Sequence, residues 1–268
     1  MLDPIWTGLA IRMAAAAGVV VLACLLVERT GPLAGAMIAT LPVSAGPAYV
    51  FLAMEHGPAF VAASALGSLA ALAATAVFVT TYTLLARRRH GLAVTLGSAF
   101  LAWGLAVAIV RPAATTLPFA LALDVLVFAA CYSLTRAARA APPALRAASR
   151  HWDIPVRALA AMGLVGAVLV IGRVLGPAAA GIAALAPVVL GSLGLLLYPR
   201  LGGPGTATVL ANTLPGLMGN AVAVAVLNQT AVGLGSLWSL LLALAICVVW
   251  NAGLLTIAGM QGRKAGLP

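Results

Sequence analysis

The sequence predicts an all-α polytopic membrane protein of about nine transmembrane helices, built from an inverted repeat of a four-helix unit joined by a connector helix. Three observations predict this fold class. Apolar residues make up 63% of the 268 positions and charged residues only 7%, so too few polar side chains exist to cover a soluble surface. The apolar residues fall in long runs, and part of the chain repeats itself. We therefore expect the bilayer to be the solvent of this protein.

Nine runs have about the 20 apolar residues that a helix needs to cross the hydrocarbon of a bilayer. No basic residue precedes the first run, so we expect it to span the membrane rather than to be a cleaved signal peptide. The three cysteines lie within apolar runs and do not indicate a disulfide framework. The expected spans are residues 6–27, 32–54, 59–86, 91–110, 116–135, 155–172, 177–198, 205–228 and 234–258.

Residues 12–57 repeat at residues 157–202 without a gap, at a shift of 145, and 14 of 46 positions are identical. A further match pairs Trp103 with Trp250 at a shift of 147, so each unit holds four spans. Five spans precede the second copy, and we therefore expect the two copies to enter the membrane from opposite sides. The matched pairs include Arg12 with Arg157, Gly18 with Gly163, Gly31-Pro32 with Gly176-Pro177, Pro42-Val43 with Pro187-Val188, Gly46 with Gly191, and Gly57 with Gly202.

This arrangement divides the chain into five segments without a separate soluble domain. We expect a first four-helix unit at 1–112, a connector transmembrane helix at 113–136, a cytoplasmic linker at 137–154, a second, inverted unit at 155–260 and a cytoplasmic tail at 261–268.

Basic residues predict the orientation. If successive connections alternate sides, one face receives twelve basic residues and the other three, and the richer face is expected to be cytoplasmic. The N-terminus then lies outside and the C-terminus inside the cytoplasmic (inner) membrane of a bacterium. The first group is Arg29, Arg87, Arg88, Arg89, Arg136, Arg139, Arg146, Arg150, Arg157, Arg200, Arg263 and Lys264; the second is Arg12, Arg111 and Arg173.

The first unit resembles the small four-helix bacterial inner-membrane proteins of the GlpM type. The resemblance rests on Ala34–Pro42 in the second span and Gly97–Leu105 in the fourth, and it implies architecture rather than chemistry. The Gly-Pro-x-x-Ala pattern that opens spans two and seven is loosely similar to helices of inverted-repeat carriers, the superfamily of bile-acid symporters and cation–proton antiporters. Those carriers place an acidic or Asn-Asp pair in the membrane, and this sequence has none.

Prolines predict a binding site where they interrupt spans two and seven. Proline lacks the N–H that a helix uses, so carbonyl groups there are left for a ligand, a hydroxyl or water. An ordinary helix kink is the simpler alternative. The candidate substrate-binding residues in these two spans are Pro42, Ser44, Gly46, Pro47, Pro187, Gly191 and Ser192.

The eighth span is the most polar. Asn212, Thr213 and Asn220 fall on one arc of a helix and complete the candidate substrate site, with both Asn side chains expected in one cavity. The third span carries a milder stripe that includes Ser68 and Thr75, which we expect to face the eighth span. Small-residue helix packing is the alternative explanation for both stripes.

Asp124 is the only carboxylate deep within an expected span. A charged carboxylate at this depth costs at least about 2.5 kcal/mol, so Asp124 is expected to bind a proton or a cation, or to face a polar cavity. This makes it the candidate coupling residue. The alternatives are a purely structural bond and a salt bridge to Arg12 or Arg157. Glu28, Glu55 and Asp153 are expected at span ends.

Arg12 and Arg157 lie a turn or two inside opposite ends of spans one and six. Their side chains could simply extend to lipid headgroups. Alternatively, the two residues could form a symmetric pair of gates on a path for anions.

These features favour a secondary transporter that moves a small polar solute, an anion being one option, by alternating access. The alternative is a non-transporting accessory or lipid-handling subunit of a larger complex, and a channel comes third. An enzyme is not expected, because the spans hold no deep His and no carboxylate pair. We expect no metal, cofactor or nucleic acid. The expected partners are a small-molecule substrate, protons or sodium, anionic lipids and, among oligomeric states, a homodimer.

We predict that reporter fusions after Arg89 and after Gly202 both report the cytoplasm, because both lie on the face that is rich in basic residues. Alkaline phosphatase and green fluorescent protein fusions at the two positions would measure this. An external signal at either position would contradict the nine-span scheme.

Overall fold

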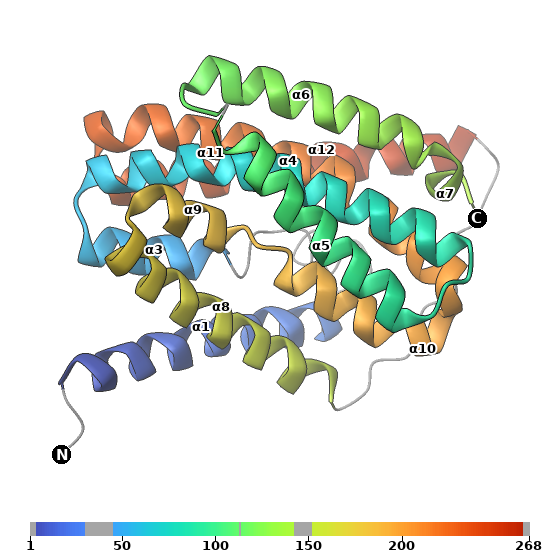
Figure 1. Ribbon diagram of the computed structural model, residues 1–268, viewed down its shortest axis with the longest axis horizontal. Coiled ribbons are helices and arrows are strands. Elements are labelled where there is room, and N and C mark those ends of the chain that lie inside the picture. The colour runs from blue at the N-terminus through green and yellow to red at the C-terminus, as the bar shows by residue number, and fades with distance from the viewer. Residues whose placement is uncertain (1–3, 30–44, 113, 142–151, 265–268) are drawn as a thin grey trace.

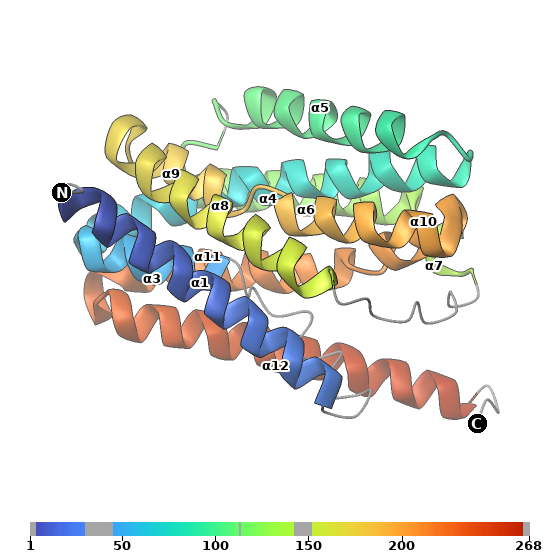
Figure 2. The ribbon, with the colours of Figure 1, turned by 90° about the horizontal axis from the view of Figure 1, so that it is seen from below.

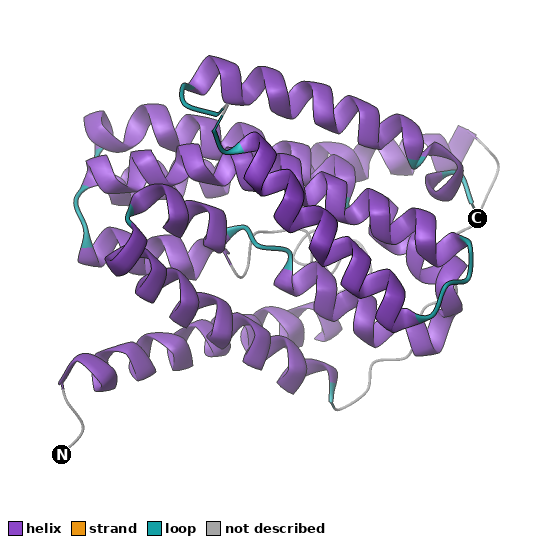
Figure 3. Ribbon diagram, viewed as in Figure 1, coloured by secondary structure: helices purple, strands orange, loops and turns teal. Residues whose placement is uncertain are grey.

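The computed structural model describes residues 4–29, 45–112, 114–141 and 152–264, and within them every regular element is a helix (Figures 1 and 3). Helices suit a chain in hydrocarbon because each backbone N–H can bond within its own segment. The helices are α1 (Pro4–Arg29), α3 (Ala45–Glu55), α4 (Pro58–Arg87), α5 (Leu92–Val110), α6 (Leu117–Leu134), α7 (Arg136–Arg139), α8 (Asp153–Leu175), α9 (Pro177–Ala184), α10 (Val188–Ala211), α11 (Leu214–Leu234) and α12 (Ser236–Lys264).

Six helical stretches of the described chain are long and apolar enough to cross a membrane. The expectation of an all-α protein with transmembrane helices is therefore confirmed at this level. The longest stretch, Pro177–Leu234, is not one straight helix. It leaves helical geometry between α9 and α10, and again inside α10 at Gly202 (φ 68°, ψ 175°), a conformation that favours glycine.

Helix α4 lies at the centre of the bundle, and α5, α6, α9, α10 and α11 all pack against it (Figure 1). Most of its side chains are buried, and many of them are Ala, Ser, Thr or Gly. Small side chains let helices approach closely, which is how helices gain packing energy in a bilayer. The polar groups of α4 are thus placed inside the protein, within reach of the surrounding helices.

The closest approach is between α4 and α9. A Cβ atom added at Gly181 would lie 1.8 Å from the carbonyl oxygen of Ser64, and one at Gly67 would lie 2.3 Å from that of Ala178. Both obstacles are backbone atoms and do not move aside easily. These two glycines are therefore required by the packing of α9 on α4.

Similar packing recurs in the two halves of the chain. Helix α11 packs along α12 as α4 packs along α5, and α1 packs against α8. In both views α1 runs opposite to α8, α4 opposite to α11, and α5 opposite to α12 (Figures 1 and 2). At the shift of 145, the end of α3 at Glu55 and the break at Gly57 correspond to Arg200 and Gly202.

Some of the residues singled out in the sequence lie outside the described part. Pro42 and Ser44, with most of the second expected span, are among them, as is most of the expected linker between residues 137 and 154. The short helix α7 at Arg136–Arg139 lies where the connector segment meets the described start of that linker.

We predict that Gly181→Ala lowers the thermal unfolding midpoint by roughly 3–10 °C, because the new methyl group meets the Ser64 carbonyl and overpacking costs about 1–3 kcal/mol. Gly163→Ala on α8 is the matched control, since a Cβ there has open space. The control should be neutral or slightly stabilising because Ala is the better helix former. Thermal unfolding of the purified protein in detergent measures both; equal midpoints would contradict the close packing.

Candidate functional site

The helix break between α9 and α10 is the starting point of the candidate site. Leu185, Ala186 and Pro187 are not helical, and α10 begins at Val188. The sequence prediction that span seven is interrupted near Pro187 is confirmed. In a bilayer, each carbonyl group freed by such a break needs a partner from the protein, because hydrocarbon offers none.

Hydroxyl groups of α4 provide these partners. Thr75 donates its hydroxyl hydrogen to the carbonyl oxygen of Leu185 at 3.2 Å, and Ser68 donates to the carbonyl oxygen of Gly181 at 2.7 Å. The hydroxyl oxygen of Ser68 also lies 2.6 Å from that of Tyr49, which must donate because the hydrogen of Ser68 is already used. Ser68 and Thr75 are two turns apart and so lie on one face of α4.

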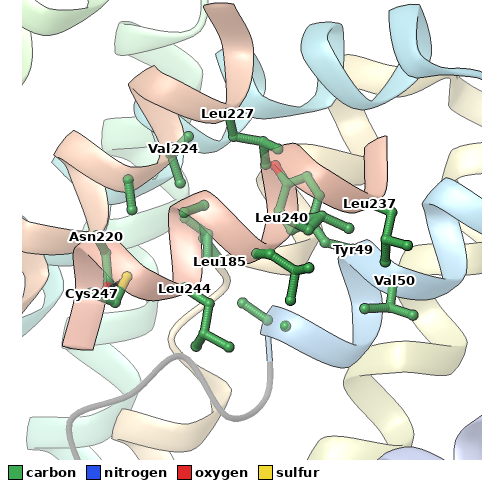
Figure 4. Close-up of a pocket in the computed structure, with 15 residues that line it drawn as sticks. Tyr49, Val50, Leu185, Asn220, Val224, Leu227, Leu237, Leu240, Leu244 and Cys247 are labelled. Carbon is green, nitrogen blue, oxygen red and sulfur yellow. Dashed lines mark hydrogen bonds between the residues drawn. The ribbon is translucent and has the colours of Figure 1, made fainter. Parts of the chain in front are cut away.

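A cavity of about 180 Å³ lies beside this break (Figure 4). Its walls are the first turns of α3, the residue Leu185 at the break, and the facing sides of α11 and α12. Leucine, valine and alanine make up eleven of the fifteen residues of the described lining. A largely apolar cavity of this size is large enough for a single aromatic ring.

The described lining contains few polar groups and no charged residue. Asn220 of α11 accepts a weak hydrogen bond on its side-chain oxygen from the thiol of Cys247 on α12, at 3.3 Å. No other hydrogen bond of the Asn220 side chain occurs within the described part of the chain. Tyr49 contributes its ring to the wall, and its hydroxyl is held by Ser68.

Of the predicted substrate-binding residues, Gly46 and Asn220 line the cavity, and Pro187 lies at the break that borders it. Pro47 follows Gly46 in the first turn of α3. Asn212 is exposed and donates to the carbonyl of Thr208 in its own helix at 2.8 Å. The structure therefore places the two asparagines apart, rather than in one cavity.

The remaining predicted residues serve local structure. Thr213 donates to the carbonyl of Leu210 at 2.7 Å, and Ser192 donates to that of Val189 at 2.8 Å. A Cβ at Gly191 would lie 2.8 Å from the ring of Phe100 on α5. Gly191 thus allows α10 to approach α5.

Sequence reasoning missed the residues that satisfy the break. Ser44 and Ser192 were the hydroxyls nearest in sequence, whereas Ser68 and Thr75 are the ones that bond to it. Both belong to the polar stripe recognised on the third span, and that stripe faces α9 and the break rather than α11 alone. Tyr49 and Cys247 carried no sequence signal because isolated polar groups in apolar spans are common.

Asp124 lies on the face of α6 that packs against α4 and α11, and its side chain is 2% exposed. It lies beside the backbone of Ala73 on α4. Neither carboxylate oxygen has a well-formed hydrogen bond within the described residues, and no described cation pairs with it. An acidic group in this position is stabilised by a bound proton, which removes the charge.

The two candidate gate residues differ. Arg12 forms an ion pair with Glu55, the last residue of α3. The structure therefore does not have the alternative salt bridge from Arg12 to Asp124. Arg157 has no ion pair within the described part. One turn earlier on α8, Asp153 pairs with Arg200 of α10 instead.

Comparisons with models of known protein families, with curated proteins and with solved structures found no match to this chain.

Proposed function

We propose that this protein is a secondary carrier, built as an inverted repeat of two four-helix units with nine membrane crossings, that moves a small solute through the cavity beside the break by alternating access. Carriers with inverted repeats place their sites near the bilayer centre, where interrupted helices meet. The observation that carries the proposal is the broken α9–α10 segment with a cavity against it. The opposite directions of α1 and α8, α4 and α11, and α5 and α12 support the inverted repeat (Figures 1 and 2).

The residues that line the cavity restrict the chemical class of solute that we propose. A polar or anionic solute was expected from the sequence, but the described walls offer one amide side chain and no cation. An anion without a partner in such surroundings would lose more in desolvation than it gains. We therefore propose a compact solute with an apolar body and a single hydrogen-bonding group that meets Asn220.

We propose Asp124 as the coupling site and the proton as the coupling ion. A bound sodium ion is held by several oxygen ligands, whereas a proton needs only one carboxylate oxygen. The buried Asp124 carboxylate, without a hydrogen-bond partner in the described residues, fits the requirement for binding a proton.

We also propose that the protein lies in a bacterial cytoplasmic membrane with its N-terminus outside. The distribution of basic residues supports this orientation.

A specific observation supports the alternative of a lipid-handling accessory subunit. Four wall residues, Val50, Leu237, Leu241 and Leu244, are also exposed on the outer surface of the described chain. The cavity therefore borders the lipid, and an acyl chain could occupy it. Transport of a solute into sealed vesicles separates the two functions.

We predict that neutral, single-ring solutes with one carbonyl or hydroxyl group raise the thermal unfolding midpoint, while organic anions of the same size do not. Binding at 100 times Kd stabilises a protein by about 2.7 kcal/mol. Ala223→Phe fills the cavity and should abolish the effect, and Val222→Phe, on the exposed side of the same turn, is the matched control. Stabilisation by anions alone would contradict the proposed solute class.

We predict that Asp124→Asn leaves the protein folded, because the amide has almost the same shape and is cheaper to bury than a charged carboxylate. In the same variant, uptake of the stabilising solute into vesicles should lose its dependence on pH. Thermal unfolding together with uptake across a pH series measures both effects. If uptake of Asp124→Asn keeps the pH profile of the parent protein, Asp124 is not the coupling residue.

A further inference from the structure

Two sets of ion pairs tie helices together at opposite ends of α8. At the end of α8, Arg173 donates two hydrogen bonds to Glu55 of α3, from Nε at 3.1 Å and from Nη2 at 2.6 Å. Arg12 of α1 pairs with the same carboxylate, whose side chain is only 8% exposed. One acidic group thus holds α1, α3 and α8 together.

At the start of α8, Asp153 pairs with Arg200 of α10. Arg200 donates from Nη1 to Oδ2 at 2.7 Å and from Nη2 to Oδ1 at 2.5 Å, which is the paired geometry that favours a strong guanidinium–carboxylate contact. Both side chains are largely shielded, with 17% and 10% exposed. This contact holds α8 to α10 two residues before the turn at Gly202.

The two sets lie on opposite faces of the membrane in the proposed arrangement. Asp153 and Arg173 are 20 residues apart on one helix, and at 1.5 Å per residue this separation is about 30 Å, the thickness of the hydrocarbon core. Each set also involves a helix whose beginning lies near the cavity: α3 starts at the cavity wall, and α10 starts three residues after Leu185. Movement of α3 or α10 away from α8 would have to break one set.

The sets occupy equivalent positions of the repeat with their charges exchanged. Glu55 and Arg200 correspond at the shift of 145; Glu55 is the last residue of α3, and Arg200 lies two residues before the kink at Gly202 in α10. In the first unit the acid is on α3 and the base on α1, whereas in the second the base is on α10 and the acid on α8. Two units that exchange conformations need a closing contact of this kind at each end.

This inference rests on the proposed function. We propose that Glu55 with Arg12 and Arg173 closes the cavity toward the N-terminal face, that Arg200 with Asp153 closes it toward the opposite face, and that transport breaks one set at a time. Both sets are formed in this structure. Separating a largely shielded pair leaves both charges uncompensated, so each set favours the arrangement in which it is formed.

Thiol accessibility tests the proposal without a known solute. Ala223→Cys places a thiol in the cavity wall of the full chain, after Cys24, Cys131 and Cys247 are changed to Ser. A membrane-impermeant thiosulfonate reagent is then added to right-side-out or inverted vesicles. We expect Glu55→Gln to raise the labelling rate about tenfold or more from the N-terminal face only. We expect Arg200→Gln to raise it by a similar factor from the opposite face only. A change of this size lies within the usual range of about 5- to 150-fold for conformational couplings.

Control and rescue variants separate a closing contact from general loosening. Arg111→Gln and Arg88→Gln remove exposed charges that belong to neither set and should leave labelling unchanged. Arg200→Asp places two carboxylates together and should open the second face, and addition of Asp153→Arg should restore the pair with reversed charges and return labelling to the parent rate. Restoration by the reversed pair is not expected if the single change merely unfolds the helix end.

The outcomes are distinguishable from failure of the proposed function. Unchanged labelling, acceleration from the same face in Glu55→Gln and Arg200→Gln, or failure of the reversed pair to restore the rate would each overturn the inference, even if vesicles take up solute. Labelling as expected from opposite faces supports it. If that result is accompanied by no uptake of any tested solute, the two sets still close the cavity toward opposite faces, and the carrier function falls.

Discussion

The structure depends on satisfying backbone carbonyl groups where a helix is interrupted inside the membrane. Hydrocarbon offers no hydrogen bonds, so a break survives only if neighbouring helices supply donors. Ser68 and Thr75 of α4 do so for Gly181 and Leu185. For these short hydroxyl side chains to reach the backbone, α9 must lie very close to α4, and Gly67 with Gly181 makes that approach possible. The central, small-residue character of α4 follows from this requirement.

Composition and repeats were sufficient to predict an all-helical membrane chain and the interruption at Pro187, because both follow from local rules on hydropathy and on the missing N–H of proline. The identity of the donors was not predictable in the same way. Which of many Ser and Thr residues meets a freed carbonyl depends on how two helices distant in sequence pack. Asn212 and Asn220 share an arc on an ideal helix, but Asn212 caps the end of α10 and Asn220 lies in α11, so only Asn220 reaches the cavity.

The sequence was informative about where charged residues lie, but it was less informative about which charges form ion pairs. The sequence placed Glu55 and Asp153 at span ends, and both lie at helix ends in the structure. Their partners are arginines on other helices, a choice set by tertiary packing. Arg12 was considered a partner for Asp124, yet Glu55 is closer to the surface and can keep its charge at lower cost. Asp124 is consequently left without a described cation, and that isolation favours a proton-binding role.

The proposed coupling between Asp124 and the cavity would have to pass through particular helices. Helix α6, which carries Asp124, packs against α4 and α11, and the described lining of the cavity contains no residue of α6. Helix α11 contributes Asn220 to that lining, while α4 holds the cavity wall at Tyr49 and Leu185 through Ser68 and Thr75. A change of charge on Asp124 alters how α6 packs on α4, since a charged carboxylate there needs water or a donor. Because α4 also holds the helix break, a shift of α4 would disturb the carbonyl bonds at Gly181 and Leu185, and this gives proton binding a physical route to the cavity.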